Sequence, residues 1–482
     1  MGALFSTASR QPSSEPSAPP ATSCKRPRLA TVQTEMENAQ LIPGVPDELS
    51  VSILARVPRG CHPSIRRVCR RWREAFVSAE LYNIRRELGV TEEWLYVLVR
   101  DEEESLSWHA LDPNTGKWQR IPPMPDIILD DDTASISPST THGWWGLSSF
   151  KVRELLRGLF GRKDATDKST FCGCAAGSVG GCLYVLGGFS RASAMRSVWL
   201  YDPRTNAWKE AAAMGTPRAY CKTALLHNKL YAVGGVNRGH AGLTPLQSAE
   251  VYEPTADTWT PIPSMPFTKA QVLPTAFLAD MLKPIATGMA SYKGKLFVPQ
   301  SLYSWPFFVD VGGEVFDPVS ETWSEMPRGM GEGWPAKQAG TKLSVVVDGS
   351  LYALDPTSSL DGSKIKVYDN EADSWKVVLR KVPILLDLSD SESPYLLAGI
   401  RNMLHVITKD INDHLIVLRA DMFNPGLTAG HAPSFSLASA SALSSSAAAS
   451  GSFSETESEQ WKTIARKNFG SVELVTCQVL DV

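Results

Sequence analysis

The sequence has little of what marks membrane, secreted or nucleic-acid-binding proteins. Among its 482 residues, 48 lysines and arginines nearly balance 51 aspartates and glutamates, and a net charge of −3 is too small to indicate a polyanionic partner. No apolar run is long enough to cross a bilayer, and the N-terminus lacks the apolar segment of a secretory signal. Eight cysteines in so long a chain indicate reduced, buried thiols and not a disulfide framework. We therefore expect a soluble protein of the cytoplasm, the nucleus or both.

Residue sets for catalysis or metal binding are also scarce. Cys172, Cys174 and Cys182 have no histidine at zinc-ligand spacing, and the aspartates at 130–132 have no second group of ligands. The eight histidines are scattered, and no Ser/His/Asp or Cys/His set can be placed. The double glycines are not followed by helix starts, which excludes phosphate-binding loops. We expect no cofactor, no metal and no catalytic residue.

What the chain has instead is a phrase that occurs five times, a turn followed by a tryptophan. Asp or Glu opens the turn and proline follows in four of the five copies. Because Asp bonds the next backbone amides and proline presets φ, each copy predicts a β-hairpin with tryptophan on its outgoing strand. The copies are LDPNTGKW at 111–118, YDPRTNAW at 201–208, YEPTADTW at 252–259, FDPVSETW at 316–323 and YDNEADSW at 368–375.

In two of the units a pair of glycines ends the buried apolar strand that precedes the phrase. This order of strand, double glycine, tyrosine and tryptophan resembles the kelch repeat, and the resemblance implies a β-propeller with aromatic side chains between its blades. Two later units have VPQ at 298–300 and LDP at 354–356 in place of the glycines. The positions that carry the kelch pattern are Gly187, Gly188, Tyr201, Trp208, Gly234, Gly235, Tyr252, Trp259, Trp323 and Trp375.

The tryptophans mark six units, because Trp461 follows two further strands near the end of the chain. The first unit lacks an opening strand, and the chain ends in a spare apolar strand, GSVELVTCQVLDV. We predict that this strand completes the first blade and so closes a six-bladed, mainly β propeller over residues 90–482. Two stretches, 126–170 and 424–458, interrupt the pattern as insertions.

Residues 41–89 predict a small all-α module of three amphipathic helices. The first is opened by Pro46 and closed by Pro58, the second spans 63–76, and the third covers 78–88. The apolar positions of the first two helices are Leu49, Ile53, Leu54, Val57, Ile65, Val68, Cys69, Trp72 and Phe76. So small a core is marginal alone, and we expect a partner to complete it.

The order of these positions resembles the F-box, although Val45 and Val57 stand where that family has leucine and His62-Pro63 replaces its Asp-Leu. The resemblance implies docking on a Skp-type adaptor, with contacts from Pro46, Leu49, Ile53, Leu54, Val57, Pro58, Val68 and Trp72. Some of these residues must form the core of the module, and the sequence does not separate the two groups. A generic helical hairpin that caps the repeat domain is the alternative. The arginines of this stretch are interpreted as a solvated helix face, since no aromatic platform for nucleic acid accompanies them.

The remaining segments carry weaker signals. Residues 1–40 are rich in Ser, Pro, Ala and Thr and predict disorder, and within them Gly2 fits a myristoylation pattern and KRPR at 25–28 a nuclear import signal. The stretch 144–163 predicts a basic amphipathic helix, which can pack on the propeller or lie on a membrane. We favour packing and expect no membrane contact.

Together, the two resemblances place the chain among the plant-type F-box/kelch proteins. They imply a non-catalytic substrate receptor of a Skp–cullin–F-box ubiquitin ligase, which binds a protein target on the propeller. Loops such as 189–197 and 236–247 are the expected target-binding rim, because loops on rigid scaffolds carry recognition. A propeller scaffold that works outside a ligase is the second hypothesis, and a propeller enzyme the third.

Overall fold

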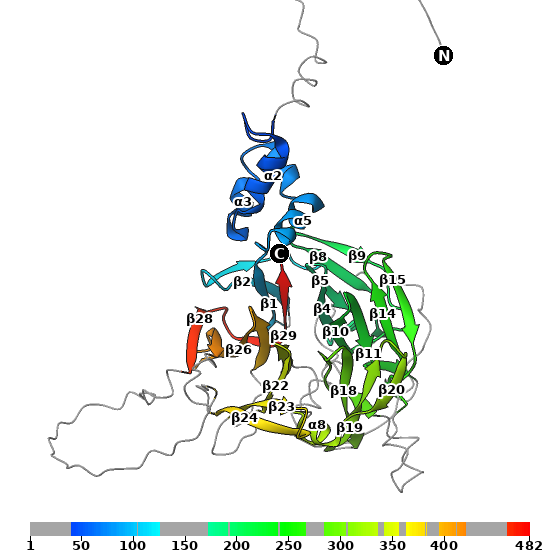
Figure 1. Cartoon of the computed structure of the whole chain (residues 1–482). Coiled ribbons are helices and arrows are strands. Elements are labelled where there is room, and N and C mark those ends of the chain that lie inside the picture. The colour runs from blue at the N-terminus through cyan, green and yellow to red at the C-terminus, as the bar shows by residue number, and fades with distance from the viewer. Residues whose placement is uncertain are drawn as a thin grey trace, which may run out of the picture.

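The computed structural model places a small helical module on a ring of β-sheets (Figure 1). It describes residues 40–103, 105–125, 172–190, 193–239, 242–266, 284–304, 307–335, 342–355, 363–380, 382, 395–410, 412–420 and 460–482. The predicted N-terminal segment up to residue 39 and both predicted insertions, 126–170 and 424–458, lie outside the described residues. The same holds for the basic amphipathic helix predicted at 144–163.

The helical module is built from short elements. They are α2 (Asp47–Ala55), the 3-10 turn η1 (Arg59–Cys61), α3 (His62–Ile65), α4 (Arg70–Ala75) and α5 (Ala79–Glu87). Helix α2 begins directly after Pro46 and has two acidic residues in its first turn, where the positive end of the helix dipole favours them. The hydroxyl of Ser78 caps α5 by accepting a hydrogen bond from the amide of Leu81 at 3.3 Å.

The predicted second helix over 63–76 is wrong in one respect, because it is interrupted between α3 and α4. Cys69 is extended, with φ −156° and ψ 171°, and its sulfur accepts a hydrogen bond from the amide of Trp72 at 3.4 Å. A cap of this kind starts a new helix and ends the old one. Val68 is therefore turned outward, with 62% of its surface exposed, while Phe76 is fully buried.

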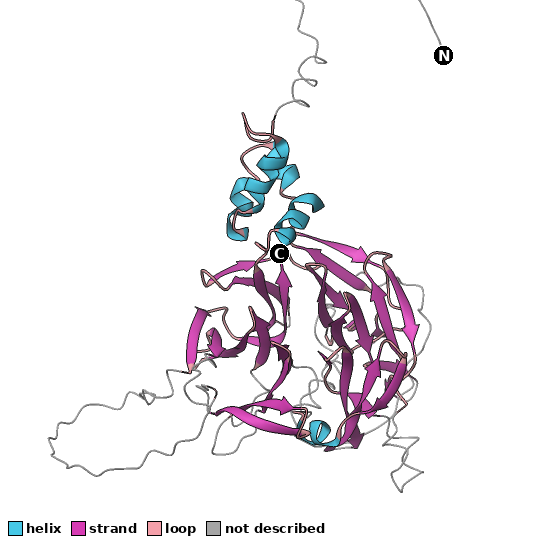
Figure 2. Ribbon diagram, in the orientation of Figure 1, coloured by secondary structure: helices cyan, strands magenta, loops and turns pink. Residues whose placement is uncertain are grey.

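The predicted six-bladed propeller is confirmed, with six sheets of four or five antiparallel strands among the described residues (Figure 2). Five of these sheets are continuous in the chain. The first holds β4 (Ala175–Val179), β5 (Cys182–Leu186), β8 (Val198–Asp202) and β9 (Ala207–Ala211), and the second holds β10 (Lys222–Leu226), β11 (Lys229–Val233), β14 (Ala249–Glu253) and β15 (Thr258–Ile262). The next blade holds β16 (Pro284–Ala286), β17 (Ala290–Tyr292), β18 (Lys295–Ser304), β19 (Phe307–Asp317) and β20 (Thr322–Glu325), followed by the helix α8 (Arg328–Gly333). The last two are β21 (Ser344–Val347), β22 (Ser350–Asp355), β23 (Lys364–Asp369) and β24 (Ser374–Arg380), then β25 (Leu396–Ile400), β26 (Met403–Lys409), β27 (Leu415–Ala420) and β28 (Trp461–Lys467).

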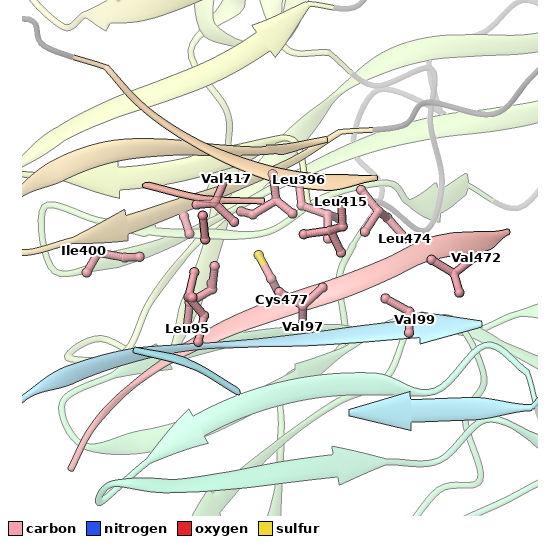
Figure 3. Packing of buried hydrophobic residues seen from close by; sticks show 14 residues of the cluster. Leu95, Val97, Val99, Leu396, Ile400, Leu415, Val417, Val472, Leu474 and Cys477 are labelled. Carbon is pink, nitrogen blue, oxygen red and sulfur yellow. The ribbon is translucent and has the colours of Figure 1, made fainter. Parts of the chain in front are cut away.

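The ring closes as predicted, through the last strand of the chain. Strand β29 (Val472–Asp481) pairs antiparallel with β1 (Glu93–Asp101), which continues into β2 (Leu106–Asp112) and β3 (Lys117–Arg120). We call this sheet blade one and number the others in chain order. Side chains from β1, β25, β27 and β29 interlock across the closing seam (Figure 3). They form a buried cluster that includes Leu95, Val97, Val99, Leu396, Leu415, Val417, Leu474 and Cys477.

Each turn-and-tryptophan phrase connects the third strand of a blade to the fourth. The residue two positions before the tryptophan is left-handed in all five phrases: Gly116, Asn206, Asp257, Glu321 and Asp373. In blades two to five the indole N–H then donates to a carbonyl that follows the preceding blade's fourth strand. These bonds run from Trp208 to Pro122 (2.9 Å), from Trp259 to Ala212 (2.9 Å), from Trp323 to Pro263 (2.7 Å) and from Trp375 to Met330 (2.9 Å). The tryptophans therefore tie consecutive blades together.

Candidate functional site

The helical module divides its apolar residues between a core and an open surface. The core consists of Leu54, Ala55, Phe76, Leu81 and Tyr82, all buried. On the opposite side of α2, Leu49 and Ile53 are four residues apart and so share one helix face, with 58% and 51% of their surfaces exposed. We call Leu49, Ile53 and the outward-facing Val68 the open apolar face.

The structure therefore separates the eight residues for which adaptor contact was predicted. Pro46 and Pro58 are exposed, like the three residues of the open apolar face. Val57 and Trp72 are half-buried against the core, and the Trp72 indole donates to the carbonyl of Leu41 at 2.8 Å. Leu54 is 3% exposed and belongs to the core itself. Five of the eight residues are therefore exposed to a partner, two are partly exposed, and one is buried.

The module's interior is small but closely specified by polar contacts. Arg85 is fully buried, and its guanidinium donates to the carbonyls of Ala55 (2.6 Å), Val57 (2.7 Å) and Val90 (3.0 Å). These bonds satisfy a charge that would otherwise be costly to bury. Because they hold the C-terminal end of α2 against α5, the open apolar face is displayed on a fixed support.

His62, the departure from the F-box pattern, is a core residue of the module. Its ring packs edge-on against Phe76 with 4.6 Å between centroids, and Nε2 lies 3.2 Å from the Val57 carbonyl. Burial, together with the nearby Arg59 guanidinium, lowers the pKa of His62 to about 3. The ring is therefore neutral at physiological pH. It is buried at the first residue of α3.

The second candidate surface is formed by loops between the second and third strands of blades two and three. Within the described residues these loops carry two small hairpins, β6 (Phe189–Ser190) with β7 (Ser193–Ala194) and β12 (Val236–Gly239) with β13 (Gly242–Pro245). Phe189 and Val236 are buried in a common cluster with Cys172 and Ala219. The two hairpins thus rise from a packed base, as a recognition surface requires.

A polar lock that the sequence analysis missed holds this base. The guanidinium of Arg218, fully buried, donates to the carbonyls of Gly234 (3.0 Å) and Ser248 (2.7 Å) and to Glu250 Oε1 (2.6 Å). The amides of Gly215 and Thr216 also donate to the Glu250 carboxylate, at 2.6 and 3.0 Å. A signal for this lock in the sequence was Glu250, a charged residue between the apolar Ala249 and Val251 in the strand AEVYE.

The double glycines lie where this lock meets the strands. Gly187 and Gly188 have φ of 55° and 102°, and the amide of Gly188 donates to the Arg218 carbonyl at 2.8 Å. A Cβ on Gly187 would lie 2.1 Å from that carbonyl oxygen. Gly234 and Gly235 also have positive φ, at 64° and 87°. All four positions favour glycine for their conformation, and Gly187 and Gly235 need it for space as well.

Within the part of the chain that the structure describes, no group of three or more His, Cys, Asp or Glu side chains could hold a metal ion. Burial raises the pKa of the Cys174 thiol to about 12 and that of Cys182 to about 11, so both are protonated and poor metal ligands. The prediction of buried thiols fails for Cys61 and Cys69, which are exposed in the helical module. None of the described helices is long and apolar enough to span a membrane.

Comparison with known proteins agrees with this division into two parts. A family model for the F-box domain matches residues 42–84, and one for the Kelch motif matches 170–215 and 217–266. F-box/kelch-repeat protein At1g22040 of Arabidopsis thaliana is 54% identical over 460 residues, which cover 95% of this chain and 94% of that protein. F-box/kelch-repeat protein At1g30090 of the same plant is 29% identical over 348 residues, 70% of each chain. The Arabidopsis F-box protein AFR is 26% identical over 326 residues, 67% of this chain and 71% of its own.

Proposed function

Because the chain belongs to the F-box/kelch-repeat family, we propose that it is the substrate-recognition subunit of a Skp–cullin–F-box ubiquitin ligase. The helical module docks on a Skp-type adaptor, and through the adaptor on a cullin–RING ligase. The propeller holds the protein to be ubiquitinated. Free thiols throughout the described residues suit a reducing compartment, so we place this activity in the cytoplasm, the nucleus or both.

The observation that carries the proposal is the open apolar face. Large aliphatic side chains with more than half of their surface exposed are costly to leave in water when they are grouped. Leu49 and Ile53 are grouped on one face of α2, beside a core of only a few residues. A partner that covers this face removes the exposure and adds to a core that is marginal alone.

The mechanism we propose is proximity, without a catalytic residue in this chain. Holding a target and a ubiquitin-charged enzyme in one assembly raises the effective concentration of target lysines near the reactive ubiquitin. The receptor then needs two binding surfaces and a stable frame between them. The open apolar face and the strand pairs β6–β7 and β12–β13 are those surfaces in this chain.

Adaptor binding by the purified full-length chain tests the proposal. The double variant Leu49→Gln/Ile53→Gln replaces both exposed side chains by polar ones with good helix propensity. We expect at least about a tenfold weaker affinity for the Skp-type adaptor, since central apolar contacts contribute about 1–2 kcal/mol each. The thermal transition should stay where it is, because neither side chain belongs to the core.

Two controls make the result specific. Val319→Gln changes an apolar residue that is 87% exposed on the propeller, and it should bind the adaptor like the wild type. Leu54→Ala should lower the stability of the module, since Leu54 is a core residue. If the folded wild-type chain does not bind the adaptor, the ligase proposal fails, and a propeller scaffold that works outside a ligase takes its place.

A further inference from the structure

Arg59, in the short turn η1, joins the helical module to the propeller. Its backbone amide donates to Glu92 Oε1 at 2.9 Å, just before strand β1. Its guanidinium donates through Nη1 to the Tyr82 hydroxyl on α5 at 3.0 Å and through Nη2 to the Pro203 carbonyl at 2.6 Å. One side chain thus bridges a helix of the module and the β8–β9 turn of blade two.

Glu92, the acceptor of the Arg59 amide, lies where the ring closes. Its backbone pairs with Val482, with N···O distances of 2.9 and 3.0 Å in the two directions. Its Oε2 accepts a hydrogen bond from the Trp94 indole at 3.2 Å, and its Oε1 lies 3.5 Å from the buried Arg85 guanidinium. The module is therefore tied to the end of the strand that completes blade one.

The turn of blade two differs from the corresponding turns of the other blades in one residue that contacts the helical module. The turn YDPRTNAW has arginine at its fourth position, where the other four phrases have Asn114, Thr255, Val319 and Glu371. The Arg204 guanidinium pairs with Asp202, at 2.9 Å, and lies over the Tyr82 ring, 5.9 Å from its centroid. Tyr82 therefore contacts both arginines: its hydroxyl accepts a hydrogen bond from Arg59, and its ring lies under Arg204.

The joint also decides which face of the propeller meets the module. Strand β8 starts after the 187–197 loop and ends at the turn that contains Pro203, so the loop and the turn lie on opposite faces of the ring. Arg59 binds on the turn face. The hairpins proposed to recognise a target therefore lie on the face opposite to the one that Arg59 contacts.

From these contacts we propose that Arg59 is a positioning residue, which fixes the helical module at one angle on blade two. The consequence for ubiquitin transfer rests on the proposed function: a fixed joint holds the target-binding loops at one distance from the adaptor. The joint itself is a property of this chain alone. It can be measured without adaptor or target.

Pulsed electron–electron resonance between two spin labels in the full chain tests this proposal. One label is placed by Asn83→Cys on the exposed side of α5 and the other by Val319→Cys in the exposed turn of blade four, with Cys24, Cys61 and Cys69 changed to serine. We expect one narrow distance distribution in this parent protein and at least a twofold broader one after Arg59→Ala. Arg59→Lys, which can reach one of the two side-chain partners but not both, should fall between them.

The matched control is Arg56→Ala, three residues away. The Arg56 guanidinium bonds only Ser52 of its own helix among the described residues, so the distribution should stay narrow. An unchanged distribution in folded Arg59→Ala overturns the proposal. If that variant does not fold, Arg59→Met, which keeps the side-chain bulk but removes both guanidinium bonds, decides in its place: broadening supports the joint, and an unchanged width contradicts it.

Adaptor binding keeps this inference separate from the proposed function. Arg59→Ala should bind the Skp-type adaptor within about twofold of the wild type, because Arg59 is not part of the open apolar face. If the wild type does not bind the adaptor but the distance distribution responds to Arg59→Ala, the joint stands and the ligase proposal fails. The reverse pattern, binding without any response of the distribution, removes the joint and leaves the ligase proposal intact.

Discussion

The propeller and the helical module treat apolar surface in opposite ways. The propeller buries its aromatic side chains between blades, as where Tyr184 and Tyr252 meet at 5.3 Å. The module buries a handful of residues and leaves Leu49, Ile53 and Val68 in solvent. A receptor needs both properties. The rigid propeller can present a target, and the exposed apolar side chains of the module can bind another subunit of a larger assembly.

The largest expected effect on stability is in the closely packed propeller. Gly187→Ala would force a Cβ to 2.1 Å from the Arg218 carbonyl at a positive φ, so the strand or the loop must move. We expect a loss of more than about 3 kcal/mol in unfolding free energy, beyond the roughly 1–2 kcal/mol of a left-handed alanine. Chemical denaturation measures it.

Gly294→Ala is the control for that change. Its φ is also positive, at 72°, but no atom lies within 4 Å of the added Cβ. It should cost about 1–2 kcal/mol, the conformational part alone. Equal losses at the two positions would show that blade packing at Gly187 contributes nothing.

A second effect should appear in the module and not in the propeller. The pKa of His62 is about 3 in the folded chain against 6.5 for a free ring, so the unfolded state binds the extra proton as pH falls below about 6.5. Stability is complete above that pH and declines toward pH 3. Between pH 7 and pH 5 we expect the module to lose about 2 kcal/mol.

Hydrogen exchange of the α2 and α5 amides, corrected for intrinsic rates, measures this loss. His62→Phe should flatten the pH dependence, since it removes the titrating ring. His227→Asn, at an exposed turn of blade three, should leave it as it is. A pH response of the module that survives His62→Phe would contradict the assignment.

The smallest effect compares blades within the propeller. Trp259→Phe removes the indole N–H that donates to Ala212, whereas the Trp118 indole nitrogen of blade one is buried without a hydrogen-bond partner among the described residues. Both changes lose the same ring volume. Trp259→Phe should therefore cost about 1 kcal/mol more than Trp118→Phe in unfolding free energy. Equal costs would mean that the indole bonds do not tie the blades.

Much of the fold could be predicted because its signals are local and repeated. The turn, the left-handed residue and the tryptophan lie within eight residues of one another, so each hairpin could be recognised separately. The closing strand could be predicted by counting, since the first blade lacked an opening strand and the C-terminal strand belonged to no other blade. In the structure Val472, Leu474, Cys477 and Leu480 of β29 are buried, as an apolar strand that closes the ring requires.

The candidate sites could be predicted only in part, because they depend on contacts between distant residues. Leu49, Ile53 and Leu54 look alike in a helical pattern, and only packing against Leu81 assigns Leu54 to the core. The break at Cys69 depends on a cap by its sulfur, and cysteine is not among the residues that usually mark the start of a helix. Arg59 and Pro203 are 144 positions apart, and no local pattern joins them.

The central claim, that the helical module is the surface completed by a partner, is tested most directly by hydrogen exchange of the full chain with and without the Skp-type adaptor. We expect slower exchange in the segments that contain the open apolar face, 46–58 and 64–72. Exchange in the propeller hairpins at 189–194 and 236–245 should not change. Protection of a propeller face, with the α2 segment unaffected, would contradict it.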